Sequence, residues 1–146
     1  MVFVGLAIVL GLIAGSAVAL QGPMISLIGQ RLGNLESVFI IHLGGAILSG
    51  IPLIFLKGGS LNEWRTLPWY VLFAGGFGMV IVGTISFGIP RIGAAAIFTI
   101  MIVAQLITAV VLDHFGWLQP TVRAVDLTRI LGISIILLGT WLVVRT

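Results

Sequence analysis

The stretch that decides the fold is GAAAIFTIMIVAQLITAVVLDHFG, residues 93–116. Its first twenty residues, Gly93 to Leu112, carry no charged side chain, and the run ends on Asp113. A helix needs roughly 20 apolar residues to cross the hydrocarbon core of a bilayer. The stretch therefore predicts a membrane-spanning helix, and Gln105 places an unusual primary amide inside it.

The composition of the whole chain extends this prediction. Of its 146 residues, 60% are hydrophobic and 8% are charged, with a mean hydropathy of +1.29, whereas about a quarter of the residues in a soluble domain are charged. Uncharged runs suited to spanning occur at 2–30, 37–56, 67–89, 92–112 and 130–144. The predicted fold class is all-α, a polytopic integral membrane bundle of five transmembrane helices. We expect a single transmembrane domain over residues 1–146, no soluble domain, and a retained first helix, since MVFVGL lacks the basic residues of a signal peptide.

The charged residues exclude several classes of function. The seven Lys and Arg residues stand singly, mostly near predicted helix ends, which is typical of a membrane interface and makes no basic patch for nucleic acid. The chain has no cysteine and no sequence motif for a metal, a nucleotide or a catalytic triad. We therefore predict no nucleic-acid partner, no cofactor, no metal site and no enzymatic activity.

The basic residues are almost evenly divided between the two sides of the membrane. Five spans place four on one side and three on the other, Lys57, Arg65, Arg123 and Arg129 against Arg31, Arg91 and Arg145. Orientation normally follows an excess of Lys and Arg in cytoplasmic loops. Two interpretations stay open. Either other features select one orientation, or the chain inserts both ways, as an antiparallel homodimer made from one gene requires.

Small residues and one proline predict how the helices pack and bend. Lipid gives no hydrophobic force between helices, so small residues at helical spacing indicate close backbone approach. Such pairs are Gly11 with Gly15, Ala46 with Gly50, Ala74 with Gly78, and Gly132 with Gly139. In the first run, Gly22 and Pro23 predict a kink or an unwound point just after Gln21, because proline removes one helical hydrogen bond. We interpret Gly22 and Pro23 as a hinge beside a pathway.

Uncharged polar side chains within the predicted spans are candidates for solute binding. The four that we select from among them are Gln21, Thr84, Ser86 and Gln105. An amide inside the membrane must find hydrogen-bond partners, and bonds between helices in a membrane are worth only about 0.6 to 2 kcal/mol each. Gln21 and Gln105 therefore have two interpretations, as the lining of a binding site or as a structural contact between helices.

Three ionisable residues are candidates for coupling transport to an ion. Glu36 follows Gly33-Asn34 in the expected first turn of a helix, where an interfacial cap is the competing interpretation. His42 lies deeper, where an imidazole that exchanges protons and a histidine that is hydrogen-bonded to a neighbouring helix are the two competing interpretations. Asp113 ends a helix, where the helix dipole is unfavourable for an anion. We expect Asp113 to have a partner such as His114 or an arginine of the neighbouring loop.

The stretch at 93–116 also carries a resemblance. Together with Trp69-Tyr70, AGGFG at 74–78 and the closing segment Gly132 to Val143, it closely resembles the bacterial five-helix YdcZ-like family of the drug/metabolite transporter superfamily, related to the small multidrug resistance exporters. The similarity covers essentially the whole chain. By this resemblance the family's motif falls on Gln21, Gln105, Asp113, His114 and Gly116.

The resemblance implies a half-transporter of the inner membrane that forms a dimer and moves a small solute by alternating access. An antiparallel homodimer with dual topology is favoured, and a paired homologue is the alternative. The chain departs from the four-helix exporters, because Gln21 stands where they carry a glutamate, and Ile25 stands where many family members have an asparagine. Two other functions stay open, a flippase for a lipid or a lipid-linked carrier and a non-transporting partner subunit of another membrane protein.

Overall fold

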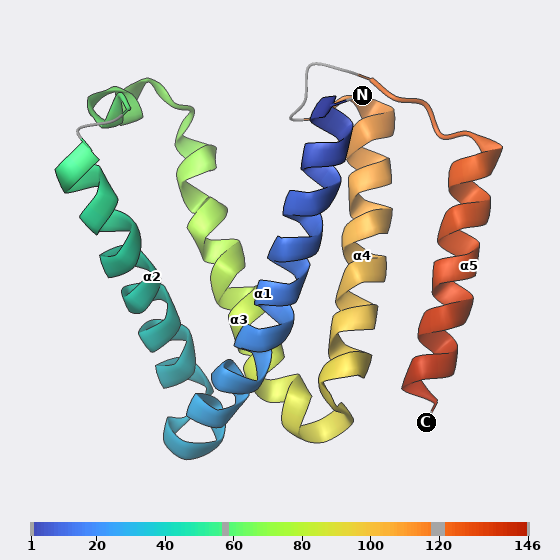
Figure 1. Ribbon diagram of the computed structural model, residues 1–146, viewed down its shortest axis with the longest axis horizontal. Coiled ribbons are helices and arrows are strands. Elements are labelled where there is room, and N and C mark those ends of the chain that lie inside the picture. Colours follow the sequence, from blue (N-terminus) through green and yellow to red (C-terminus); the bar gives the residue numbers. More distant parts are fainter. Residues whose placement is uncertain (1, 57–58, 118–121, 146) are drawn as a thin grey trace. The chain divides into compact units, whose positions relative to one another are not determined.

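The computed structural model describes residues 2–56, 59–117 and 122–145, and this part of the chain is helical with no strand (Figure 1). In chain order the elements are α1 (Val2–Leu32), α2 (Asn34–Leu56), the 3-10 helices η1 (Leu61–Thr66) and η2 (Trp69–Phe73), α3 (Ala74–Ile92), α4 (Ala94–Phe115) and α5 (Leu127–Val144). Five segments are long and apolar enough to cross a membrane. The predicted fold class is confirmed. Lys57 lies outside the described residues.

Several helices extend past the uncharged runs because caps, and not charges, set their ends. α2 begins at Asn34 and not at residue 37, directly after Gly33. α5 begins at Leu127 and not at residue 130, because the side chain of Asp126 accepts a hydrogen bond from the backbone N–H of Arg129 at 2.7 Å. α4 continues to Phe115 and stops where Gly116 turns left-handed, with a φ of 65°.

The third span starts differently from the prediction. A continuous helix was expected over residues 67–89, but the span begins with the 3-10 helix η2, and α3 then runs from Ala74 to Ile92. Pro68 explains the change, because it has an extended ψ of 136° at the N-cap of η2 and offers no N–H. The apolar segment Trp69–Ile92 as a whole still has the length of a membrane span.

α1 passes through its proline without interruption. The helix runs from Val2 to Leu32 with Pro23 inside it, so the chain is not unwound after Gln21. Pro23 withholds a single N–H from the preceding turn, and the helix continues on both sides. The hinge role of Gly22 and Pro23 remains a prediction.

The chain divides into two compact units, Met1–Arg91 and Ile92–Thr146, and each is described by itself. In the first unit α1 packs along α2, and the Ser37 hydroxyl donates to the Ile25 carbonyl at 2.9 Å. The Ser86 hydroxyl of α3 donates to Asn34 Oδ1 of α2 at 2.8 Å. α2 and α3 thus meet near the turn between α1 and α2, and they diverge toward η1 and η2 (Figure 1).

The second unit is a helical hairpin in which α4 packs along α5. Gly116 ends α4, and the backbone N–H of Trp117 closes the turn on the Leu112 carbonyl at 3.1 Å. A side chain at Gly116 would also approach Val122 Cγ2 at 2.7 Å, so glycine serves both the backbone conformation and the close passage of the returning chain.

Close packing at the predicted glycine pairs occurs at one position. Gly78 of α3 lies against His42 of α2, where a side chain would not fit. A Cβ atom would meet no described atom within 4 Å at the other glycines of these pairs, which are Gly11, Gly15, Gly50, Gly132 and Gly139. Within the described residues of each unit those helix faces are open, and the close contacts expected there are not formed inside that unit.

Candidate functional site

The first turn of α2 divides two chemically different spaces in the first unit. Successive residues of an α-helix point about 100° apart, so Asn34 and Glu36 face nearly opposite sides. Glu36 lines an apolar groove between α2 and α3, whereas Asn34 lines a polar pocket at the turn between α1 and α2. Gly33 begins this turn with a φ of 118°, a conformation that suits glycine.

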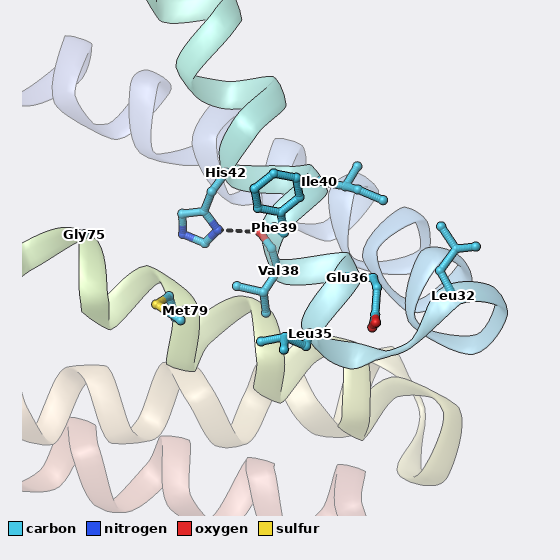
Figure 2. Close-up of a pocket in the computed structure, with 9 residues that line it drawn as sticks. All are labelled: Leu32, Leu35, Glu36, Val38, Phe39, Ile40, His42, Gly75 and Met79. Carbon is cyan, nitrogen blue, oxygen red and sulfur yellow. Dashed lines mark hydrogen bonds between the residues drawn. The ribbon is translucent and has the colours of Figure 1, made fainter.

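The α2–α3 groove is the larger space, with a volume of about 760 Å³. Its lining consists of Leu32 at the end of α1, six residues of α2 between Leu35 and His42, and Gly75 and Met79 of α3 (Figure 2). The lining is almost entirely apolar, and its two ionisable members are Glu36 and His42. The groove can therefore make many contacts with the apolar part of a small molecule and very few with a polar group.

His42 presents one ring nitrogen to this groove. Its Nδ1 lies 2.7 Å from the Val38 carbonyl oxygen, one helical turn earlier (Figure 2). A carbonyl only accepts hydrogen bonds, so in the neutral ring Nδ1 carries the hydrogen and Nε2 keeps a free lone pair. The half-buried imidazole is thereby held with Nε2 as a hydrogen-bond acceptor.

The absence of a side chain at Gly78 leaves space for the His42 ring. A Cβ atom on Gly78 would lie 2.6 Å from His42 Nε2, closer than such contacts normally are. Because α3 has no side chain at this position, His42 Nε2 can lie close to the backbone of α3. The sequence predicts Gly78 only as a packing residue, because its contact with His42 depends on the register between two helices.

Glu36 occupies the opposite end of the groove from His42. It lies in the first turn of α2, as predicted, with an exposed side chain whose carboxylate lies beside Gly33. The helix dipole favours an anion at this end. His42 lies six positions after Glu36, which is about 9 Å along the helix. An interfacial carboxylate and a deeper imidazole therefore share one apolar lining.

The turn pocket lies on the other side of α2 and has a volume of about 520 Å³. Its lining is Gly29, Gln30, Gly33, Asn34, Ser86, Pro90 and Arg91. The Ser86 hydroxyl, fully buried at 1% exposure, fixes Asn34 by donating to its Oδ1. A side chain on Gly29 would collide with Ser86 Oγ, so Gly29 lets α1 approach α3 at this point.

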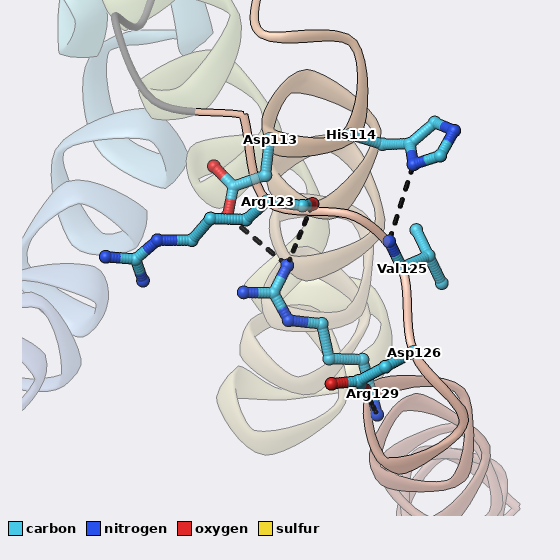
Figure 3. Close-up of polar contacts among 6 residues, drawn as sticks. All are labelled: Asp113, His114, Arg123, Val125, Asp126 and Arg129. Atoms are coloured by element: carbon cyan, nitrogen blue, oxygen red, sulfur yellow. Dashed lines mark hydrogen bonds and ion pairs between the residues drawn. The ribbon is translucent and has the colours of Figure 1, made fainter.

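The second unit carries a charged cluster where α4 turns toward α5 (Figure 3). The Asp113 carboxylate lies 3.6 Å from the guanidinium of Arg129, and both side chains are about a quarter exposed, at 24% and 29%. The Asp113 carbonyl accepts from the backbone N–H of Arg123 at 2.9 Å. His114 Nδ1 accepts from the backbone N–H of Val125 at 3.4 Å. The prediction that an arginine pairs with Asp113 is confirmed, and the partner lies in the first turn of α5.

The remaining predicted site residues are not among those that line the groove. Gln21 of α1, Thr84 of α3 and Gln105 of α4 are exposed on their helices. Within the described residues neither glutamine side chain forms a hydrogen bond. Ser86 is committed to Asn34 in the turn pocket. Of the three coupling candidates, Glu36 and His42 share the groove, while Asp113 pairs with Arg129 in the other unit.

The helices and the two pockets define a class of protein, a multi-pass membrane protein with binding space between its spans. Residues 6–142 match the family described as "Putative inner membrane exporter, YdcZ". The chain belongs to this family, and the resemblance found in the sequence is confirmed. It is accordingly a multi-pass protein of the bacterial inner membrane. Exporters are transporters, so the family description agrees with a transporter and not an enzyme.

One curated relative shows the same extent of similarity. The chain is 24% identical over 135 residues to the "Inner membrane protein YdcZ" of Escherichia coli (strain K12), and the match covers 90% of each protein. No solved structure matches the chain.

Proposed function

We propose that the chain is a half-transporter that moves a small solute across the inner membrane by alternating access, as an antiparallel homodimer. The observation that carries the proposal is the α2–α3 groove, an apolar space of about 760 Å³ in which His42 offers a free acceptor and Glu36 a carboxylate. Binding pockets for small molecules are typically apolar spaces of this size with a few convergent polar groups. The family match to exporters agrees with a transport role.

The groove favours a solute with an apolar body and one N–H or O–H group. Apolar side chains of α2 and α3 contact the body, and His42 Nε2 accepts the hydrogen of the polar group. His42 and Glu36 are then the residues that couple solute movement to a proton, because both line the same space. Asp113 is a weaker candidate for coupling, because Arg129 already neutralises it.

Dimer formation is supported by charge and by open helix faces. The near-balance of four basic residues against three favours insertion in both orientations. The faces bearing Gly11, Gly15 and Gly50 have no close neighbour among the described residues, and small residues allow close approach of another helix. In such a dimer the exposed Gln21 and Gln105 would face the second copy or the shared pathway.

Solute binding is tested with purified protein and a panel of small amphiphilic compounds in a thermal-shift screen. A compound that stabilises the wild type should lose most of its effect with His42→Phe and Gly78→Ala, and it should keep the effect with Gly76→Ala, because a Cβ at Gly76 meets nothing within 4 Å. Hits are then assayed for uptake into proteoliposomes. Equal stabilisation of His42→Phe, or binding without uptake, would refute the proposal.

The same assay separates the other two functions. Movement of a fluorescent phospholipid between leaflets, with no solute uptake, would indicate a flippase. Absence of both activities until a second membrane protein is added would indicate a partner subunit.

Orientation is tested with single cysteines, which the natural chain lacks entirely. Asn62→Cys lies in η1, between the second and third spans, and Val144→Cys lies at the end of α5. Five spans place these two positions on opposite sides. An antiparallel dimer predicts that each cysteine reacts with impermeant maleimide from both sides of the membrane. Labelling of each from a single side would contradict dual topology.

A further inference from the structure

We infer that the turn pocket is a second binding site, separate from the solute groove, that receives a phosphate ester group at the membrane interface. Its seven lining residues include one cation, Arg91, and no anion. Glu36, the nearest carboxylate along the chain, belongs to the lining of the groove, although its carboxylate lies beside Gly33, which lines the turn pocket.

Contacts with Phe87 hold the Arg91 guanidinium in place and leave several of its N–H donors without an acceptor among the described residues. Its guanidinium donates to the Phe87 carbonyl one turn earlier, and the guanidinium carbon lies 3.5 Å from the centre of the Phe87 ring. These contacts fix the planar group against α3. Among the described residues no carboxylate pairs with Arg91. A guanidinium has five N–H donors in a fork that matches phosphate oxygens.

Two amides provide further donors on the facing wall. Asn34 Oδ1 accepts from Ser86, which leaves both hydrogens on Asn34 Nδ2 without an acceptor among the described residues. Gln30 Nε2 uses one hydrogen on Ser26 Oγ at 3.0 Å and keeps the other. Arg91, Asn34 and Gln30 thus place donors around one polar space, and an anion with several acceptor oxygens satisfies them together.

The position of the turn pocket agrees with a lipid-derived phosphate. It lies where α1 ends at Leu32, α2 begins at Asn34 and α3 reaches its last turn at Arg91. Spanning helices end near the level of the lipid head groups. Basic pockets between transmembrane helices are known sites for lipid phosphates. A soluble phosphate ester has the same chemistry, and the experiment below separates the two sources.

The test measures binding calorimetrically to the full chain in a phosphate-free, non-ionic detergent. The probes are dihexanoyl phosphatidylglycerol, glycerol 1-phosphate, inorganic phosphate and dihexanoylglycerol, which lacks the phosphate. We expect the phospholipid to bind and dihexanoylglycerol not to bind. Tight binding of the phospholipid alone indicates a membrane lipid, and equal binding of glycerol 1-phosphate or inorganic phosphate indicates a soluble phosphate.

Asn34→Asp is the variant that best separates phosphate binding from folding. The new carboxylate still accepts from Ser86 and suits the first turn of α2, but it replaces two donors with a negative charge. We expect at least tenfold weaker phosphate binding with Asn34→Asp and with Arg91→Gln. Arg31→Gln, in the same turn but outside the pocket lining, should change affinity less than twofold.

Three results would overturn the inference. They are the failure of the wild type to bind any of the three phosphate-bearing probes, equal binding of dihexanoylglycerol, and an equal loss with Arg31→Gln and Asn34→Asp. His42→Phe should leave phosphate binding unchanged, so failure of the proposed transport function and failure of this site are distinguishable.

Discussion

The two units of the chain hold their helices together by different means. In the unit of α1 to α3 the polar contacts between helices are neutral, with serine hydroxyls donating to the Ile25 carbonyl and to Asn34. In the unit of α4 and α5 the side-chain contact that joins the helices is the ion pair of Asp113 and Arg129 at the membrane edge. The two serines that donate these hydrogen bonds are fully buried, whereas the two side chains of the ion pair are about a quarter exposed.

This difference follows from the cost of removing charge from water. A buried ion pair loses more hydration than its attraction recovers unless its geometry is excellent. A hydroxyl that donates to a carbonyl costs far less to bury. The first unit can therefore bring helices close enough to form specific pockets, and the second unit keeps its charges where the chain turns. Substitutions that attack each kind of contact should differ in size.

The largest expected effect is at Gly29. In Gly29→Ala the new Cβ collides with the buried Ser86 hydroxyl, which cannot move without releasing Asn34. Overpacking of this kind typically costs about 1–3 kcal/mol. The thermal unfolding midpoint in detergent should fall by several degrees. Gly45→Ala, in α2, is the matched control, because a Cβ there meets nothing within 4 Å. An equal fall of the unfolding midpoint in the control would mean that the loss of stability does not come from the contact between α1 and α3.

A smaller effect on stability, with a larger effect on the groove, is expected for Gly78→Ala. The Cβ would lie 2.6 Å from His42 Nε2, but the imidazole is the mobile end of a side chain and can swing away. We expect a loss of less than about 1 kcal/mol, since one part-buried hydrogen bond is exchanged. The His42 ring signals in NMR spectra should shift strongly, and Gly76→Ala should leave them in place.

The helices are easier to predict from the sequence than the contacts between them. The five spans follow from hydropathy alone, and Glu36 was placed correctly because Gly33-Asn34 marks a helix start. The pairing of His42 with Gly78, and of Asn34 with Ser86, depends on how two helices are rotated and aligned. Residue type does not encode that register, so the sequence could not show that the Ser86 hydroxyl donates to Asn34 of another helix.

Asp113→Asn tests the weaker contact of the second unit. Partly exposed ion pairs contribute about 0.2–1 kcal/mol and are screened by salt. The unfolding midpoint should fall slightly in low salt, and the difference from wild type should vanish in 1 M salt. Asp126→Asn removes a neighbouring carboxylate but keeps an N-cap residue. If both substitutions cost the same at every salt concentration, the Asp113–Arg129 pair contributes nothing of its own.

The last test measures histidine tautomers and not protein stability, and it compares the two units most directly. The chain has two histidines, and their contacts require opposite neutral tautomers. His42 Nδ1 faces the Val38 carbonyl and must carry the hydrogen, whereas His114 Nδ1 accepts from the Val125 N–H and leaves the hydrogen on Nε2. Nitrogen-15 NMR of histidine-labelled protein at alkaline pH should show one ring of each kind, and His42→Gln should remove only the Nδ1–H form. Two rings of the same tautomer would show that one of these contacts is not formed, and the variant would identify which one.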